Sequence, residues 1–239
     1  MHSDKKPISF PNLLAVDTAT PVCSVAISHG NHLVVENTNA TLQTHSRHLL
    51  KMIENALTMA KIELFDLDGL VVTRGPGSFT GLRIGVSTIK GLAKAIGKPF
   101  IGVSYLECLV RQSAIADGLV CAIIDARRKE FYYALYCFEN YQIKVVMPES
   151  VGTLSHLLEK INDRCLFIGN GIYSNYGQLV EKLGNKASFG LDYHNILKSD
   201  TLIWVGRAQL KIGRQDCIES FVPDYIRKSD AQINLAKSV

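Results

Sequence analysis

Acidic and hydroxyl residues follow the first apolar run of the chain, where a strand is expected to end. Residues 13–16 are apolar, and Asp17, Thr18, Ala19 and Thr20 come directly after them. A carboxylate at a strand end, beside small hydroxyl residues, can hold a metal-bound phosphate. The alternative is that Asp17 and Thr18 hydrogen-bond to their own backbone within a turn. We favour the turn, because the methyl group of Ala19 would crowd a phosphate.

A glycine-rich segment, residues 74–86, is the most distinctive stretch of the chain. It follows an expected strand and opens an expected helix, whose free N–H groups could bind an anion. It matches neither the P-loop pattern nor the dinucleotide-binding pattern. Gly81 and Gly85 lie four residues apart on one helix face, and Leu82 and Ile89 extend an apolar stripe beside them. Since small residues let another backbone approach closely, this face should be buried, by the protein's own sheet or by a partner.

Two histidines, His45 and His48, stand three residues apart at the start of another expected helix. Side chains at this spacing can share a metal ion. No third ligand of matching type lies near them in the sequence. We therefore favour a polar helix N-terminus over a metal site, and we expect no metal site elsewhere in the chain.

Basic residues occur in three groups, each of which we interpret as a solvated face rather than a phosphate track. No aromatic residues alternate with them, as they would in many nucleic-acid-binding segments. The groups are residues 127–129, Arg207 with Lys211 and Arg214, and Arg227 with Lys228.

The composition predicts a folded, cytoplasmic protein. The chain has 239 residues, of which 47% are hydrophobic and 20% charged, with a formal net charge of +4. No apolar run is long enough to span a bilayer. The six cysteines include no C-x-x-C pair, and the N-terminus lacks the pattern of a secretory signal, so disulfides are not expected.

Apolar periodicity predicts that one order of elements occurs twice along the chain. In the first half, strands are expected at 13–16, 22–27, 32–35, 69–73 and 100–103, and helices at 45–61, 80–96 and 105–116. In the second half, strands are expected at 120–125, 131–138, 143–147 and 165–168, and helices at 154–161, 176–183 and 201–212. Two βββαβαβα lobes of this kind indicate an α/β protein with the duplicated ribonuclease-H-like fold of the actin superfamily. We expect a flexible tail at 1–11, an N-terminal lobe at 12–110, and a C-terminal lobe with a C-terminal extension at 111–239.

Several segments resemble the TsaB (YeaZ) family, bacterial partner proteins in the biosynthesis of threonylcarbamoyladenosine in tRNA. The resemblance is specific in the first half of the chain and looser in the second. It is carried by residues 13–20, 44–50 and 75–85, and more weakly by 125–128, 169–171 and 223–227.

The same segments also resemble TsaD, the catalytic relative of TsaB. In TsaD, two histidines that bind a metal follow the strand after the glycine-rich helix. Tyr105 and Leu109 stand at the corresponding positions here. Leucine has no lone pair, and a phenol with a pKa near ~10 is a poor ligand at neutral pH. The resemblance therefore implies a subunit without catalytic residues.

The resemblance implies pairing with TsaD through the first two helices of the N-terminal lobe. We expect two exposed apolar stripes to form this interface, and a homodimer to form on the same surface when TsaD is absent. A bulky residue at Gly85 should then abolish pairing and leave the fold intact. The stripes are Leu49, Met52, Ile53 and Ala56 on the first helix, and Gly81, Leu82, Gly85 and Ile89 on the second.

The same resemblance also implies a tRNA substrate, a further subunit and a nucleotide. The assembly would modify adenosine 37 of tRNAs that read codons beginning with A, and it would include the ATPase TsaE. Contact of this chain with tRNA would be indirect, and no cofactor would be tightly bound. ATP or ADP could be held near the junction with TsaD, with Asp17 and Thr18 as candidate ligands.

Two other function classes remain open from the sequence. One is a kinase or ATPase of the actin superfamily that uses Asp17 and Asp125 around a metal-bound phosphate. The other is a metallopeptidase, which Tyr105 and Leu109 disfavour. ATP binding with turnover by the isolated chain would indicate the first class, and a stoichiometric metal would indicate the second.

Overall fold

The structure, a computed structural model, describes residues 12–40, 45–113 and 117–227. The expected N-terminal tail, residues 1–11, lies outside the described residues. Within the part described, no helix combines the length and the apolar character that a membrane span requires.

The first sheet has five strands in the order β3-β2-β1-β4-β5. Strands β1 to β3 form an antiparallel meander, and β4 and β5 run parallel to β1. Gly30 closes the first hairpin with a φ of 59°, a conformation that glycine adopts without steric cost. The strands are β1 (Leu13–Asp17), β2 (Cys23–His29), β3 (His32–Asn39), β4 (Gly69–Gly75) and β5 (Phe100–Ser104).

The second sheet repeats this topology in the order β10-β9-β6-β7-β8. Its first three strands are again antiparallel, and β9 and β10 again run parallel to the central strand. The strands are β6 (Gly118–Asp125), β7 (Phe131–Glu139), β8 (Gln142–Gly152), β9 (Cys165–Ile168) and β10 (Ala187–Phe189). The sequence did not predict β10, because three partly exposed residues are too short a run to stand out. With this strand added, the predicted duplicated α/β fold is confirmed.

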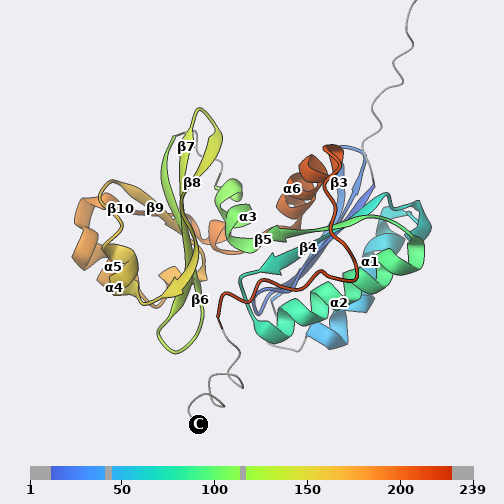
Figure 1. Cartoon of the computed structure of the whole chain (residues 1–239), viewed down its shortest axis with the longest axis horizontal. Helices are drawn as coiled ribbons and strands as arrows, with labels where there is room; N and C mark the ends of the chain where they lie inside the picture. The colour runs from blue at the N-terminus through green and yellow to red at the C-terminus, as the bar shows by residue number, and fades with distance from the viewer. Residues whose placement is uncertain (1–11, 41–44, 114–116, 228–239) are drawn as a thin grey trace, which may run out of the picture.

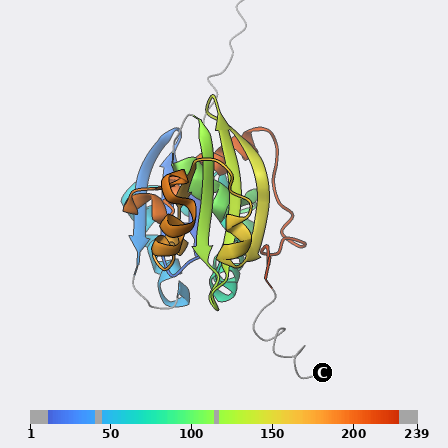
Figure 2. The same cartoon turned by 90° about the vertical axis from the view of Figure 1, so that its left-hand side faces the viewer.

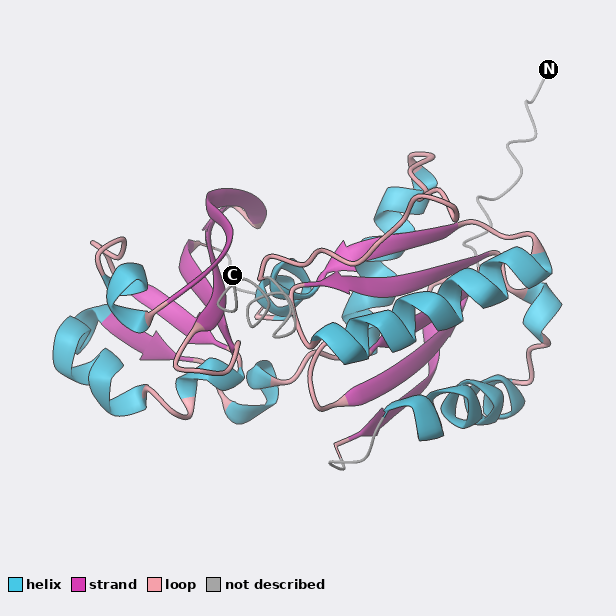
Figure 3. Cartoon of the chain, turned by 60° about the horizontal axis from the view of Figure 1, so that its bottom comes forward, coloured by secondary structure: helices cyan, strands magenta, loops and turns pink. Residues whose placement is uncertain are grey.

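The helices form three layers that alternate with the two sheets (Figure 1). Helices α1 and α2 cover the outer face of the first sheet, where they run beside each other (Figure 3). Helices α4 and α5 cover the outer face of the second sheet (Figure 2). Helices α3 and α6 fill the space between the sheets. The helices are α1 (His45–Ala60), α2 (Phe79–Ile96), α3 (Tyr105–Gln112), α4 (Leu154–Leu158), α5 (Tyr176–Leu183) and α6 (Ser199–Lys211), with short 3-10 turns such as η1 (Leu64–Asp66).

Local signals in the sequence define most helix ends. Ser104 caps α3 by accepting a hydrogen bond from the N–H of Glu107 at 3.0 Å. Gly97 ends α2 in the left-handed conformation, which glycine adopts readily. Helix α3 ends at Gln112, before the expected residue 116, and residues 114–116 lie outside the described part.

Helix α6 follows the second sheet in sequence but packs on the first sheet. Gly206 lies so close to Val71 of β4 that a Cβ at this position would overlap the valine side chain. At the start of α6, the hydroxyls of Ser199 and Ser24 of β2 are 2.5 Å apart. The expected units 12–110 and 111–239 therefore each hold one sheet, but the helix that completes the first sheet's inner face comes from the second unit.

A final segment, residues 213–227, runs without regular structure along the edge of the first sheet, and we call it the strap (Figure 1). The N–H of Asp216 donates to the carbonyl of Phe100 at 2.9 Å, and the Asp216 carboxylate accepts from the N–H of Gly102 at 2.7 Å. Phe221 packs edge-on against Phe100 with ring centroids 5.1 Å apart. The strap thus covers the open edge of β5, which would otherwise expose unpaired backbone groups.

Candidate functional site

Asp17 lies at the end of β1 and is almost completely buried, with 1% of its surface exposed. Its Oδ1 accepts hydrogen bonds from the N–H of Ala19 at 2.9 Å and from the hydroxyl of Thr73 at 2.8 Å. Burial raises the pKa of this carboxyl from 3.8 to about 6, against the opposing effect of these hydrogen bonds. The carboxylate is therefore used to shape the turn, as the second interpretation of the sequence holds.

The glycine-rich segment closes over this turn. The N–H of Ser78 donates to the carbonyl of Ala19 at 2.6 Å, and a Cβ at Gly77 would overlap that same carbonyl. The hydroxyl of Thr18 donates to the carbonyl of Gly81 at 2.8 Å. Asp17 and Thr18 therefore make hydrogen bonds within the chain, and their role as nucleotide ligands stays a prediction.

The two glycines of α2 serve contacts within the chain. A Cβ at Gly81 would overlap the carbonyl oxygen of Thr18, and a Cβ at Gly85 would overlap the Thr18 hydroxyl. Of the two alternatives for this helix face, burial by the protein's own sheet is correct. The expectation that a bulky residue at Gly85 would leave the fold intact is therefore wrong.

His45 is held by a contact within the chain as well. Its Nε2 lies 2.8 Å from the carbonyl oxygen of Thr20, which ties the start of α1 to the turn after β1. This contact agrees with a polar helix N-terminus. Among the residues that the structure describes, no three histidine, cysteine, aspartate or glutamate side chains are grouped as metal ligands would be.

Tyr105 and Leu109 both point into the core between the sheets, with 2% and 0% of their surface exposed. Burial is the main cause that raises the pKa of the Tyr105 phenol well above its usual value of 10. A neutral phenol in an apolar layer does not attract a cation. These positions therefore contribute to packing in this chain.

The two apolar stripes on α1 and α2 are buried against the first sheet, so the prediction that they are exposed is wrong. All eight residues are buried, because the outer face of the sheet is itself apolar and is covered by these two helices. They are Leu49, Met52, Ile53, Ala56, Gly81, Leu82, Gly85 and Ile89.

The opposite faces of α1 and α2 point to solvent. On α2 this face combines four small residues, Thr80, Ser87, Gly91 and Ala95, with the exposed Arg83 and Lys94. A Cβ at Gly91 would meet open space. The outward side of α1 carries two large apolar residues, Leu50 at 62% exposure and Met59 at 68%. A helix with small outward residues can accept the close approach of another helix.

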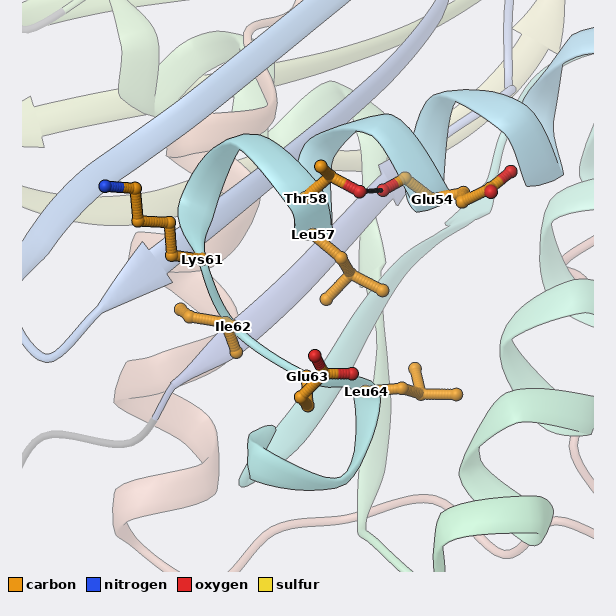
Figure 4. A pocket seen from close by; sticks show the side chains of 7 residues that line it. All are labelled: Glu54, Leu57, Thr58, Lys61, Ile62, Glu63 and Leu64. Atoms are coloured by element: carbon orange, nitrogen blue, oxygen red, sulfur yellow. Dashed lines mark hydrogen bonds between the residues drawn. The ribbon is translucent and has the colours of Figure 1, made fainter.

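A shallow hollow of about 330 Å³ lies at the C-terminal end of α1, between that helix and η1 (Figure 4). Leu57, Ile62 and Leu64 supply its apolar part, and Glu54 and Glu63 supply acidic groups. Thr58 does not offer its hydroxyl to the hollow, since it donates to the carbonyl of Glu54 at 2.9 Å. The hollow therefore lies next to the outward side of α1 and is lined by both apolar and acidic side chains.

Comparison with known proteins gives consistent matches over most of the chain. Residues 39–235 match the family model described as TsaD, tRNA N6-adenosine threonylcarbamoyltransferase. The tRNA threonylcarbamoyladenosine biosynthesis protein TsaB of Escherichia coli is 30% identical over 230 residues, which cover 92% of this chain and 96% of that protein. The TsaB protein of Bacillus subtilis is 28% identical, over 95% of this chain and 98% of that protein.

A solved structure agrees with these matches. YeaZ from Pseudomonas aeruginosa superposes with a TM-score of 0.74 at 27% identity, over 90% of this chain and 99% of that one. The family model, the sequence relatives and the fold thus coincide over nearly the whole chain. The chain belongs to the TsaB family, within the wider group that the TsaD family model describes.

Proposed function

We propose that this chain is a non-catalytic partner subunit of a TsaD-type transferase in a cytoplasmic assembly. The assembly forms N6-threonylcarbamoyladenosine at position 37 of tRNAs that read codons beginning with A. One observation carries the proposal. The positions that correspond to the metal-binding histidines of TsaD, and the turn at Asp17, serve packing in this chain. Tyr105 and Leu109 fill the core, and the turn at Asp17 is closed by residues 77–81.

The proposed pairing surface is the outward side of α1 and α2. It differs from the surface expected from sequence, because the apolar stripes of both helices are buried. The small residues of α2 allow another helix to approach between the exposed Arg83 and Lys94. Leu50 and Met59 are exposed apolar residues of α1. In the absence of the TsaD-type subunit, a second copy of the chain would occupy the same surface. An ATP or ADP molecule near the junction would bind at this surface, and the ATPase TsaE would join the assembled pair.

Reconstitution of the modification reaction tests the proposal. The TsaD-type subunit and TsaE, with threonylcarbamoyl donor, ATP and unmodified tRNA, should form modified adenosine only when this chain is added. The isolated chain should neither hydrolyse ATP nor contain a stoichiometric metal. Full modification without the chain, or ATP turnover by the chain alone, would refute the proposal.

A further inference from the structure

The turn that joins β6 to β7 has an unusual backbone. Arg127, Arg128 and Lys129 have φ values of 65°, 54° and 62°, so three consecutive residues with side chains are in the left-handed region. All three are exposed to solvent. The hairpin between β7 and β8 needs only two such residues, Asn140 and Tyr141.

This conformation is costly for arginine and lysine. In the left-handed region the Cβ of a residue comes close to the following carbonyl oxygen, which is unfavourable, and glycine or asparagine would lower that cost. The turn nevertheless carries a basic residue at each of the three positions. Backbone strain of this kind persists only where surrounding contacts hold it in place.

Contacts from two directions hold the turn. The guanidinium of Arg227, at the end of the strap, donates to the carbonyl of Ala126, and its Nε lies 3.4 Å from the carboxylate of Glu130. The Arg227 side chain is only 13% exposed. From the other side, the carboxylate of Asp125 accepts a hydrogen bond from the N–H of Arg127 at 2.7 Å. The end of the strap lies beside this turn at the lower end of the second sheet (Figure 1).

These contacts also engage the nearest acidic groups. Glu130 pairs with Arg227, and Asp125 binds a backbone N–H. Residues 125–130 and Arg227 together carry four basic side chains and two carboxylates, a formal charge of +2 among these described residues. Three exposed basic side chains project from a backbone that is fixed before any ligand arrives.

We propose that the turn of Arg127, Arg128 and Lys129 is a contact site for the phosphodiester backbone of tRNA. The guanidinium of arginine can donate two parallel hydrogen bonds to phosphate oxygens. A turn that is ordered before binding also avoids part of the loss of conformational entropy that binding requires. The inference rests on the proposed function only for the choice of tRNA as the nucleic acid. It departs from the sequence-based expectation that this group is a solvated face and that tRNA contact is indirect.

Binding of unmodified tRNA, followed by fluorescence anisotropy over a range of salt concentrations, tests this site. The full chain would be measured alone and in complex with the TsaD-type subunit. The triple variant Arg127→Gln, Arg128→Gln, Lys129→Gln should bind tRNA more weakly, and its log–log salt slope should be smaller by about two to three.

The matched control removes three positive charges elsewhere in the same lobe, with Lys160→Gln, Lys182→Gln and Lys186→Gln. All three lysines are exposed. The control should bind tRNA as the unmodified chain does. Equal weakening by both triple variants, or by neither, overturns the proposal. Displacement of tRNA by millimolar ATP would assign the turn to a nucleotide and also overturn it.

A second variant separates a binding role from a purely structural one. Lys129→Gly relieves the left-handed strain, so the midpoint of thermal unfolding should stay the same or rise by about 2 °C. tRNA binding should still weaken, because one cation is lost. A lower unfolding midpoint with unchanged tRNA binding would contradict the proposal. Co-purification with the TsaD-type subunit, measured on the same variants, reports separately on the proposed function.

Discussion

At the scale of the single residue, Asp17 should make stability depend on pH. Its pKa is raised to about 6 in the folded chain, so the folded state binds this proton more tightly than the unfolded state does. The stability that protonated Asp17 contributes is fully present below about pH 4. It is lost as the pH rises through 6, which lowers the free energy of unfolding by about 3 kcal/mol. Urea unfolding between pH 4 and 7 should therefore show a steeper decline for the native chain than for Asp17→Asn. Parallel curves for the two proteins would contradict the burial of an ionisable group at this turn.

Glycines on the two faces of α2 should respond oppositely to the same substitution. At Gly85 a Cβ would overlap the Thr18 hydroxyl, so Gly85→Ala should lower the free energy of unfolding by about 1–3 kcal/mol. At Gly91 the space is open, so Gly91→Ala should raise it by about 0.5–1 kcal/mol. Chemical denaturation of both variants measures the difference.

A double variant identifies the cause of the loss at Gly85. Thr18→Ala removes the hydroxyl that a Cβ would meet, so Thr18→Ala with Gly85→Ala should be less destabilised than the sum of the two single changes. Strict additivity would mean that the Thr18 hydroxyl is not what requires a glycine at position 85.

At the scale of the element, the outward face of α2 should govern pairing. Gly91→Arg places a long side chain on this face without an internal overlap. It should abolish co-purification with the TsaD-type subunit and leave the unfolding midpoint unchanged or higher. The matched control is Gly177→Arg on α5, another exposed helical glycine with open space around its Cβ. Normal pairing by Gly91→Arg, or equal loss in the control, would rule out this face of α2 as the interface.

At the scale of the whole molecule, the packing of α6 on the first sheet should make the two lobes fold as one unit. The inner face of the first sheet is covered by α6, which lies more than a hundred residues after β1 in sequence. A fragment of residues 12–113 should therefore lack a cooperative thermal transition by circular dichroism, because that face would be open to water. Fusion of residues 197–227 to the same fragment restores α6 and the strap, and should restore the transition. Independent cooperative folding of residues 12–113 would contradict this view.

Individual elements were predictable because their signals are local. Ser104 and Gly97 define helix ends by backbone hydrogen bonding and by left-handed conformation, and both effects act within a few residues. The strand β10 was missed because parallel pairing with β9 specifies it, rather than any pattern within its three residues.

The candidate site was predictable in part. The turn at Asp17 was predicted, because the methyl group of Ala19 would crowd a phosphate. Its closure by the glycine-rich segment was not predicted, because Ser78 reaches the carbonyl of Ala19 only in the folded chain. The basic turn at residues 127–129 was visible as a charge group only. Its left-handed backbone depends on Arg227, a hundred residues away, and no short-range pattern reports such a contact.

By itself, the sequence determined most of the strands and the longer helices, the apolar side of α1 and of α2, and the family to which the chain is similar. Only the tertiary structure decided what covers those apolar sides. The stripe at Leu49 and the stripe at Gly81 suit either a partner or the chain's own sheet, because burial depends on apolar area and not on whose area it is. The first sheet and the turn after β1 cover both stripes, so these residues are buried within the chain. The same packing removes water from Asp17, and this desolvation raises its pKa.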